Sequence, residues 1–299
     1  FTSALASTTL NSCTNLDEKI LPGRKVSEGG STVATADLSS VYAQLNSFAN
    51  NQENMFAMEE HPSDEMMGPT RGTDWDDFGR WRKLHTHTWD ATHDQLLGAW
   101  NQFHIGAFRG TLTMANSTAS ALEKAEARFL RAFFQFYLVD TFGKLPVREA
   151  TDGIDVNPKV LTRKEATDYL IAEVEASVAA LPNVSNTSKA SKEAANALLA
   201  KLYLNRAVYI ADPTNPGGPY NFDKSDMNKV IAACDQIIAS GKFALQPAGS
   251  YYKTFYWDNT KDTKEIIFGV DNSEANQRAA NKNFHSNQSL HYNLGGHDQ

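Results

Sequence analysis

The chain has 299 residues, 41% of them hydrophobic, which is enough for one large or two ordinary domains with a substantial core. Its formal net charge of -7, without any run of Lys or Arg, excludes a basic surface for nucleic acid. No stretch approaches the roughly 20 uninterrupted apolar residues that a membrane-spanning helix needs. We therefore predict a globular protein that does not bind nucleic acid.

The first 34 residues are polar and are predicted to form a processing site and a flexible tether, followed by a helical domain over 35–299. Cys13 lies in STTLNSCTNLDEKI, where a leucine three residues upstream and a serine just before it resemble a bacterial lipoprotein processing site. The preceding residues lack an initial Met and a basic start, so they would be a clipped signal peptide. The alternative is an irregular terminus with an ordinary thiol, and the pattern alone favours neither.

Helical periodicity begins near Thr35, and Asp37 can cap the first helix. Its apolar face consists of Leu38, Val41, Tyr42, Leu45, Phe48 and Ala49. A long interruption follows from residue 59 to about residue 92, and loops of this length inside a domain are usually functional. The helical pattern then returns, with a stripe of Leu96, Leu97, Trp100, Phe103, His104 and Ala107.

The segment 123–142 is apolar almost all round and must be sandwiched between other helices. Its polar residues form one narrow strip: Lys124, Arg128, Arg131 and Gln135. The charged members of the strip are predicted to be solvated or to form inter-helix salt bridges, with a peptide groove as the competing idea. Glu126 is expected to meet an arginine of a neighbouring helix. Gly143 and Pro146 end the segment.

Four further elements follow along the chain. The sequence TRKE at Thr162 is a capping box that starts a helix running to Leu181, and an alanine-rich helix comes next. Gly241 ends a shorter helix, and KEIIFGVD is predicted to be a strand. Two of the predicted helices carry matching residues 68 positions apart, which is two periods of the tetratricopeptide repeat. They are Ala127, Leu130 and Ala132 in one helix and Ala195, Leu198 and Ala200 in the other. We therefore predict a mainly α fold of tetratricopeptide-like stacked helix pairs, with long irregular loops and a minor β element.

Five segments together resemble the SusD/RagB family, in order over residues 35–270: AWNQFHIGAF, AEARFLRAFFQFYLVDTFGKLPV, AANALLAKLYL, SGKFAL and KEIIFGV. The resemblance implies a lipid-anchored protein of the bacterial outer membrane and cell surface. Such a protein captures oligosaccharide or polysaccharide and delivers it to a SusC-like TonB-dependent transporter, without catalysis. Family members are longer, so we expect the C-terminal part of the family fold to be missing from this chain.

The loop sequence PTRGTDWDDFGRW carries residues suited to a sugar. Pyranose rings need a flat apolar surface for their C–H faces and planar polar groups for adjacent hydroxyls. Trp75 and Trp81 are predicted to supply the platform, and the polar groups are predicted to be Arg71, Asp74, Asp77 and Arg80. The resemblance supports this site, because family ligand aromatics follow an acidic pair, here Asp64 and Glu65. The opposing interpretation is that these tryptophans fill the core, which is favoured for Trp89 and Trp100.

The chain offers only weak signals for catalysis. The histidines of LHTHTWDATHD, with Asp90 and Asp94, suggest a zinc site, but structural histidines near the core are favoured for His85, His87 and His93. Glu123 and Glu126 are not set across a cleft as a glycosidase pair would be. We predict no catalytic residue, cofactor or metal, and keep a helical-repeat scaffold for peptides and a metal-dependent hydrolase as alternatives to glycan binding.

Overall fold

The protein is described here by a computed structural model that covers residues 36–49, 53–68, 76–152, 155–256, 259 and 263–271. These residues all lie in the unit Ala34–Gln299. Four of the predicted functional residues lie outside the described residues: Cys13, Arg71, Asp74 and Trp75.

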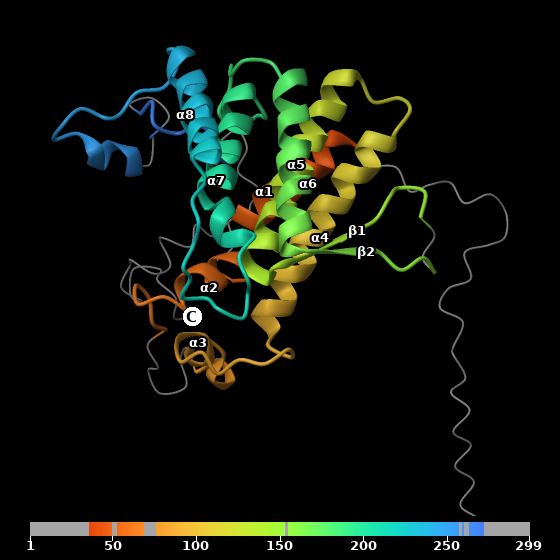
Figure 1. The fold of residues 1–299 in the computed structure, drawn as a ribbon, viewed down its shortest axis with the longest axis vertical. Helices are drawn as coiled ribbons and strands as arrows, with labels where there is room; N and C mark the ends of the chain where they lie inside the picture. Colours follow the sequence, from red (N-terminus) through yellow and green to blue (C-terminus); the bar gives the residue numbers. More distant parts are fainter. Residues whose placement is uncertain are drawn as a thin grey trace, which may run out of the picture. The chain divides into compact units, whose positions relative to one another are not determined.

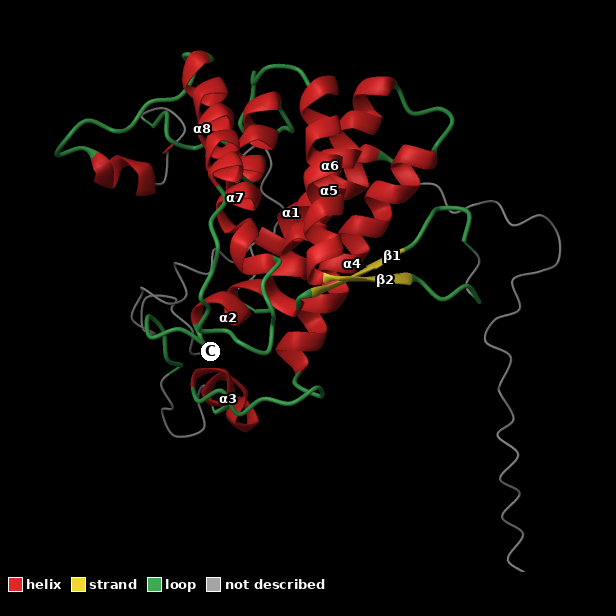
Figure 2. Ribbon diagram, in the orientation of Figure 1, coloured by secondary structure: helices red, strands yellow, loops and turns green. Residues whose placement is uncertain are grey.

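Helices dominate the described part of the chain (Figures 1 and 2). They are α1 (Leu38–Ala49), α2 (Met55–Glu60), α3 (Arg80–His85), α4 (Asp94–Ala115), α5 (Ala121–Phe142), α6 (Arg163–Ala180), α7 (Lys192–Tyr209) and α8 (Lys224–Ala239), with short 3-10 helices η1 (Asp77–Gly79) and η2 (Tyr251–Phe255). Strands β1 (Lys144–Val147) and β2 (Lys159–Thr162) pair antiparallel, with Lys144 opposite Thr162. The predicted mainly α fold with a minor β element is confirmed. No helix in the described ranges is long and apolar enough to cross a membrane.

Helix α5 lies between α4 and α6, as its nearly uniform apolar surface requires (Figure 1). Its fully buried side chains are Phe129, Leu130, Phe134, Phe136 and Leu138. Burial of each such side chain contributes about 1.5–3 kcal/mol to folding. Helix α7 packs against α6 on one side and α8 on the other, which extends the stack.

Helices α4 and α5 approach closely because α4 presents glycines to α5. A Cβ added to Gly106 would lie 2.5 Å from the ring of Phe134, and one added to Gly110 would lie 2.9 Å from Cβ of Arg131. Arg131 itself is buried and forms an ion pair with Glu173 of α6. Arg131 therefore forms an inter-helix salt bridge, which was one of the two main expectations for the charged residues of the polar strip.

The helix ends are set by local signals. Ser120 and Glu123 form a capping box at the start of α5, and Thr162 and Glu165 form the predicted one at α6. Gly143 ends α5 in the left-handed region with φ of 67°. Asp37 accepts the backbone N–H of Ser40 at the start of α1, as predicted.

Two sequence-based expectations about packing are wrong. Among the described residues Glu126 pairs with no arginine: its carboxylate accepts a hydrogen bond from the hydroxyl of Tyr42, which itself accepts one from the N–H of Ala190. Residues 263–271 form no strand. Their described backbone bonds to other segments are isolated ones, such as the N–H of Gly269 to the carbonyl of Thr187, and no neighbouring segment supplies a ladder.

A small cluster of buried side chains joins α2 to α3, apart from the main core. Its buried members are Ala57, Trp81 and Leu84, with Met58, Trp89 and Leu96 packed against them. Trp89 and Trp100 are both partly buried and pack against the two cores, as the core-filling interpretation expected.

Candidate functional site

The turn before α3 projects a phenylalanine outward. Asp77, Phe78 and Gly79 have φ of 38°, 57° and 75°, so three consecutive residues occupy the left-handed side of backbone space. Such angles are uncommon for residues other than glycine and are a mark of functional segments. The side chain of Phe78 is 98% exposed as a result. An aromatic face is therefore presented to solvent in the lining of a pocket.

Trp81, by contrast, faces inward. It is 2% exposed, and the imidazole of His61 packs on its ring at 4.8 Å between centroids. Its Nε1–H donates to Oδ2 of Asp77 at 2.6 Å. A Cβ added to Gly68 would lie 2.9 Å from Cβ of Trp81, so the segment before the loop also presses on it. The expectation that Trp81 forms an outward stacking platform is wrong. Its indole packs against buried apolar side chains, and its N–H has a hydrogen-bond acceptor in Asp77.

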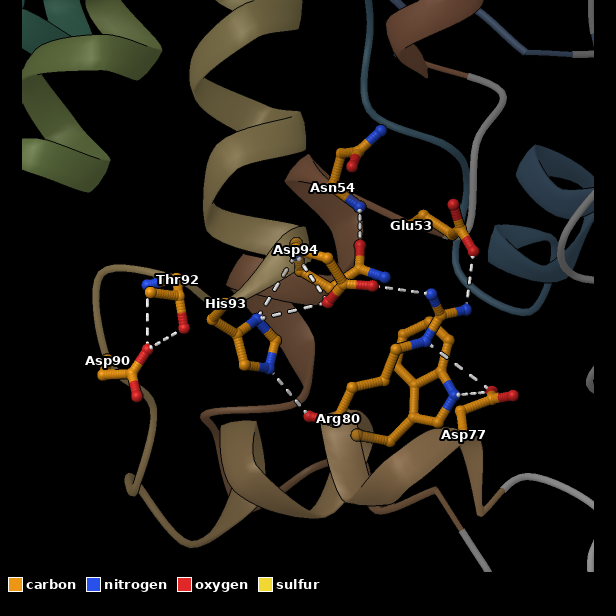
Figure 3. Close-up of polar contacts among 10 residues, drawn as sticks. Glu53, Asn54, Asp77, Arg80, Asp90, Thr92, His93 and Asp94 are labelled. Atoms are coloured by element: carbon orange, nitrogen blue, oxygen red, sulfur yellow. Dashed lines mark hydrogen bonds and ion pairs between the residues drawn. The ribbon is translucent and has the colours of Figure 1, made fainter. Parts of the chain in front are cut away.

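Arg80 holds three acidic side chains together at the base of the pocket (Figure 3). Its Nη1 lies 2.9 Å from Asp94 Oδ2, its Nη2 2.8 Å from Glu53 Oε1 and its Nε 3.7 Å from Asp77 Oδ2. Its guanidinium also lies 4.6 Å from the centre of the Trp81 ring. Partial burial raises the pKa of Asp94, but the hydrogen bond and charge of Arg80 outweigh it, so the net shift is downward. Asp94 is thus ionised at neutral pH.

The opposite wall of the pocket is the turn that leads into α4. Asp90 Oδ1 accepts both the N–H of Thr92 at 2.8 Å and its hydroxyl at 2.6 Å (Figure 3). The hydroxyl bond, followed by the backbone bond, lowers the pKa of Asp90. His93 is buried; its Nδ1 accepts the N–H of Gln95 at 3.3 Å, so its Nε2–H donates to the carbonyl of Arg80 at 3.0 Å.

These groups enclose a pocket of about 400 Å³. Its lining residues are Asp77, Phe78, Arg80, Lys83, Asp90, Thr92, His93 and Asp94. The size is within the range of small-molecule sites, and the lining combines one exposed aromatic ring with several carboxylate acceptors and a lysine. This set of groups suits a ligand that has an apolar ring face edged by hydroxyl groups.

The structure brings together only part of the predicted site. Asp77 and Arg80 lie at the pocket, while Trp81 lies behind them, and the remaining three predicted residues fall outside the described ranges. Phe78 was missed by sequence reasoning. The available signal was its place between two aspartates and a glycine, where an inward apolar residue would also have to bury carboxylates.

The three histidines that raised a metal-site alternative serve different partners. His93 bonds Arg80, His87 bonds the carbonyl of Pro62 at 2.7 Å, and His85 lies on α3. Within the ranges that the structure describes, no group of three or more His, Cys, Asp or Glu side chains is arranged to hold a metal ion.

Comparison with known protein families gives a match over more than half of the chain. The sequence profile of a SusD-like family, described as starch-binding and associating with outer membrane, matches residues 25–204. A SusD-like protein of Bacteroides ovatus is 28% identical over 194 residues, which are 59% of this chain and 33% of that protein.

Solved structures have the same fold. One was crystallised with xylogluco-oligosaccharide; it matches with a TM-score of 0.65 at 20% identity, and the match covers 84% of this chain and 49% of the chain in that structure. A laminarin-binding SusD-like protein matches with a TM-score of 0.55 at 18% identity, and the match covers 74% of this chain and 48% of that protein's chain. The chain spans about half the length of these structures and a third of the Bacteroides ovatus relative. The predicted SusD-like fold is confirmed.

Proposed function

Because the chain belongs to the SusD-like family, described as starch-binding and associating with outer membrane, we propose that it captures glycans at the bacterial cell surface. It binds oligosaccharide or polysaccharide without catalysing a reaction. It then passes the ligand to a SusC-like TonB-dependent transporter in the outer membrane. A lipid on Cys13 anchors it there.

The observation that carries this proposal is the exposed ring of Phe78 at the rim of an acceptor-lined pocket. A pyranose laid on the ring would place its C–H face against an apolar surface and its hydroxyl edge toward the carboxylates. Exposure of a large aromatic side chain has no folding benefit, since its apolar area stays in water. The exposed ring together with its place beside the pocket supports a ligand-contact role for this turn.

The residues outside the described ranges complete the proposed site. Trp75 lies three residues before Phe78, and we assign it a second stacking surface, with Arg71 and Asp74 as hydrogen-bonding groups. Asp77 and Arg80 keep their proposed ligand-binding role, with Arg80 acting mainly by holding the carboxylates in place. Trp81 acts only as the packed support beneath them.

Affinity gel electrophoresis and calorimetry against a glycan panel test the proposal. Xylogluco-oligosaccharide and laminarin are suitable starting ligands, since they are named with two structures of the same fold. We expect Phe78→Ala to weaken binding about tenfold, because an aromatic contact contributes roughly 0.5–1.5 kcal/mol beyond area burial. Phe78→Tyr, which keeps the ring, should bind like the natural chain.

A matched control is Phe255→Ala. Phe255 is 71% exposed and does not line the pocket, so its loss should leave glycan affinity unchanged. Absence of binding to every glycan of the panel would count against the proposed function. Full binding by a variant that combines Phe78→Ala with Trp75→Ala would count against the site. The anchor is tested separately: Cys13→Ala in the full-length protein should move it out of the membrane fraction.

A further inference from the structure

We propose that the pocket at Phe78 discriminates by charge, and that it accepts neutral glycans while it disfavours uronic-acid or sulfated ones. This inference rests on the proposed glycan function and concerns which class of glycan the site takes. It is carried by the charges that line the pocket. Three carboxylates line it, those of Asp77, Asp90 and Asp94, against the two cations of Arg80 and Lys83.

The charge of Arg80 is already engaged inside the protein. Its two terminal nitrogens bind Asp94 and Glu53 at 2.9 and 2.8 Å, and its Nε lies 3.7 Å from Asp77. One cation thus neutralises part of a group of three carboxylates: each terminal nitrogen donates to a carboxylate, and Nε is buried. A carboxylate or sulfate of a ligand would have to displace one of these bonds to reach the guanidinium.

His93 belongs to the pocket lining, but both of its ring nitrogens are engaged within the protein. Its Nδ1 accepts a backbone N–H, which leaves Nε2 as the proton-bearing nitrogen that donates to the carbonyl of Arg80. The ring also lies buried, away from contact with a ligand charge.

The exposed rim therefore carries Asp90 and Lys83 as its opposing charges. Only Oδ1 of Asp90 is used, by Thr92; in the described ranges Oδ2 accepts no hydrogen bond. Lys83 is exposed and lines the pocket. The charges of Asp90 and Lys83 offset each other, and Arg80 is already paired with carboxylates, so the lining has more carboxylates than cations. The pocket therefore offers mostly hydrogen-bond acceptors. Sugar hydroxyls can donate to these acceptors, whereas added carboxylates cannot.

The test compares two ligands with one backbone. The probe is the neutral oligosaccharide that binds best among xylogluco- and laminari-oligosaccharides, together with the same molecule oxidised at C6 to carboxylates. We expect the oxidised form to bind roughly twofold more weakly for each added carboxylate in dilute buffer, because the lining has one carboxylate more than it has cations and a pair of like charges about 8 Å apart in water opposes binding by a factor of about 2.4. The difference should shrink in about 500 mM salt, where screening is strong.

Two variants should change the ratio of the affinities for the neutral and oxidised ligands in opposite directions. Asp90→Asn keeps an oxygen for the Thr92 turn and removes one charge, so it should narrow the gap between the two ligands by about twofold. Lys83→Gln should widen it by a similar factor. Both side chains are exposed, so neither change threatens the fold.

The outcomes separate this inference from the proposed function. Equal or tighter binding of the oxidised oligosaccharide by the natural chain overturns the charge discrimination and leaves the glycan site standing. Discrimination that stays unchanged in both variants also overturns it, since the named charges would not be its source. Failure of both ligands to bind overturns the glycan site and this inference together.

Discussion

The indole of Trp81 and the carboxylate of Asp77 form one unit, in which Nε1–H donates to Oδ2 at 2.6 Å. The bond ties a residue of the small core to the turn that carries Phe78. Burial of the tryptophan and exposure of the phenylalanine are thus two results of the same turn. The proposed ligand face at Phe78 thus rests on a packed aromatic support and is not itself part of the core.

Trp81→Ala should destabilise the protein by about 3–5 kcal/mol, as expected for removal of a large, fully buried aromatic side chain. Trp81→Phe should cost less, because it keeps most of the packing and loses the bond to Asp77. Urea unfolding followed by circular dichroism measures both. Phe78→Ala is the control, with a change within about 0.5 kcal/mol. A fully stable Trp81→Ala variant with weakened glycan binding would restore the ligand-contact role.

His61 should make the protein sensitive to acid. It is 1% exposed, and neither ring nitrogen has a hydrogen-bond partner in the described ranges. Burial, and secondly the charge of His85, lowers the pKa of His61 from 6.5 to about 4. The unfolded chain binds the proton first, so stability is full above about pH 6.5 and is lost as the pH falls toward 4, by up to about 3 kcal/mol.

The variant His61→Leu tests this dependence. Since the ring nitrogens are unpaired, leucine leaves no broken hydrogen bond, and the variant should fold at neutral pH. Unfolding free energies measured between pH 7 and pH 4 should fall less in the variant than in the natural chain. Parallel curves for the two proteins would show that another group is responsible.

Tyr42 links three segments through one hydroxyl. It donates to Glu126 of α5 and receives the N–H of Ala190, while burial, the largest influence, raises its pKa so that it remains protonated. Tyr42→Phe leaves both partners unsatisfied in a partly buried site, and should cost about 1–3 kcal/mol. Tyr252→Phe, at a residue that is 52% exposed, is the control and should be neutral in the same thermal unfolding experiment.

Gly106 allows the close approach of α4 to α5. Gly106→Ala should destabilise the protein by about 1–3 kcal/mol, because the new Cβ meets the buried ring of Phe134. Gly217→Ala is the matched control, since a Cβ there has nothing within 4 Å. An unchanged unfolding midpoint for Gly106→Ala would mean that the two helices can separate at little cost.

The helices and their ends could be predicted from the amino-acid sequence because the forces that set them are local. A capping box at Thr162 and a left-handed glycine at residue 143 act on backbone groups within a few residues. The apolar circumference of α5 required neighbours on several sides, whatever their identity. These features, with the family resemblance, determined the fold class.

Tertiary structure alone decided which partners the side chains meet. Glu126 required some polar partner, but only the packing of α1 against α5 made that partner Tyr42. Trp81 and Phe78 are both aromatic residues of one short segment. The turn at Asp77 directs Trp81 into the buried cluster of α2 and α3 and directs Phe78 into water. Such choices depend on contacts between segments distant in the sequence, which residue spacing within one segment does not encode.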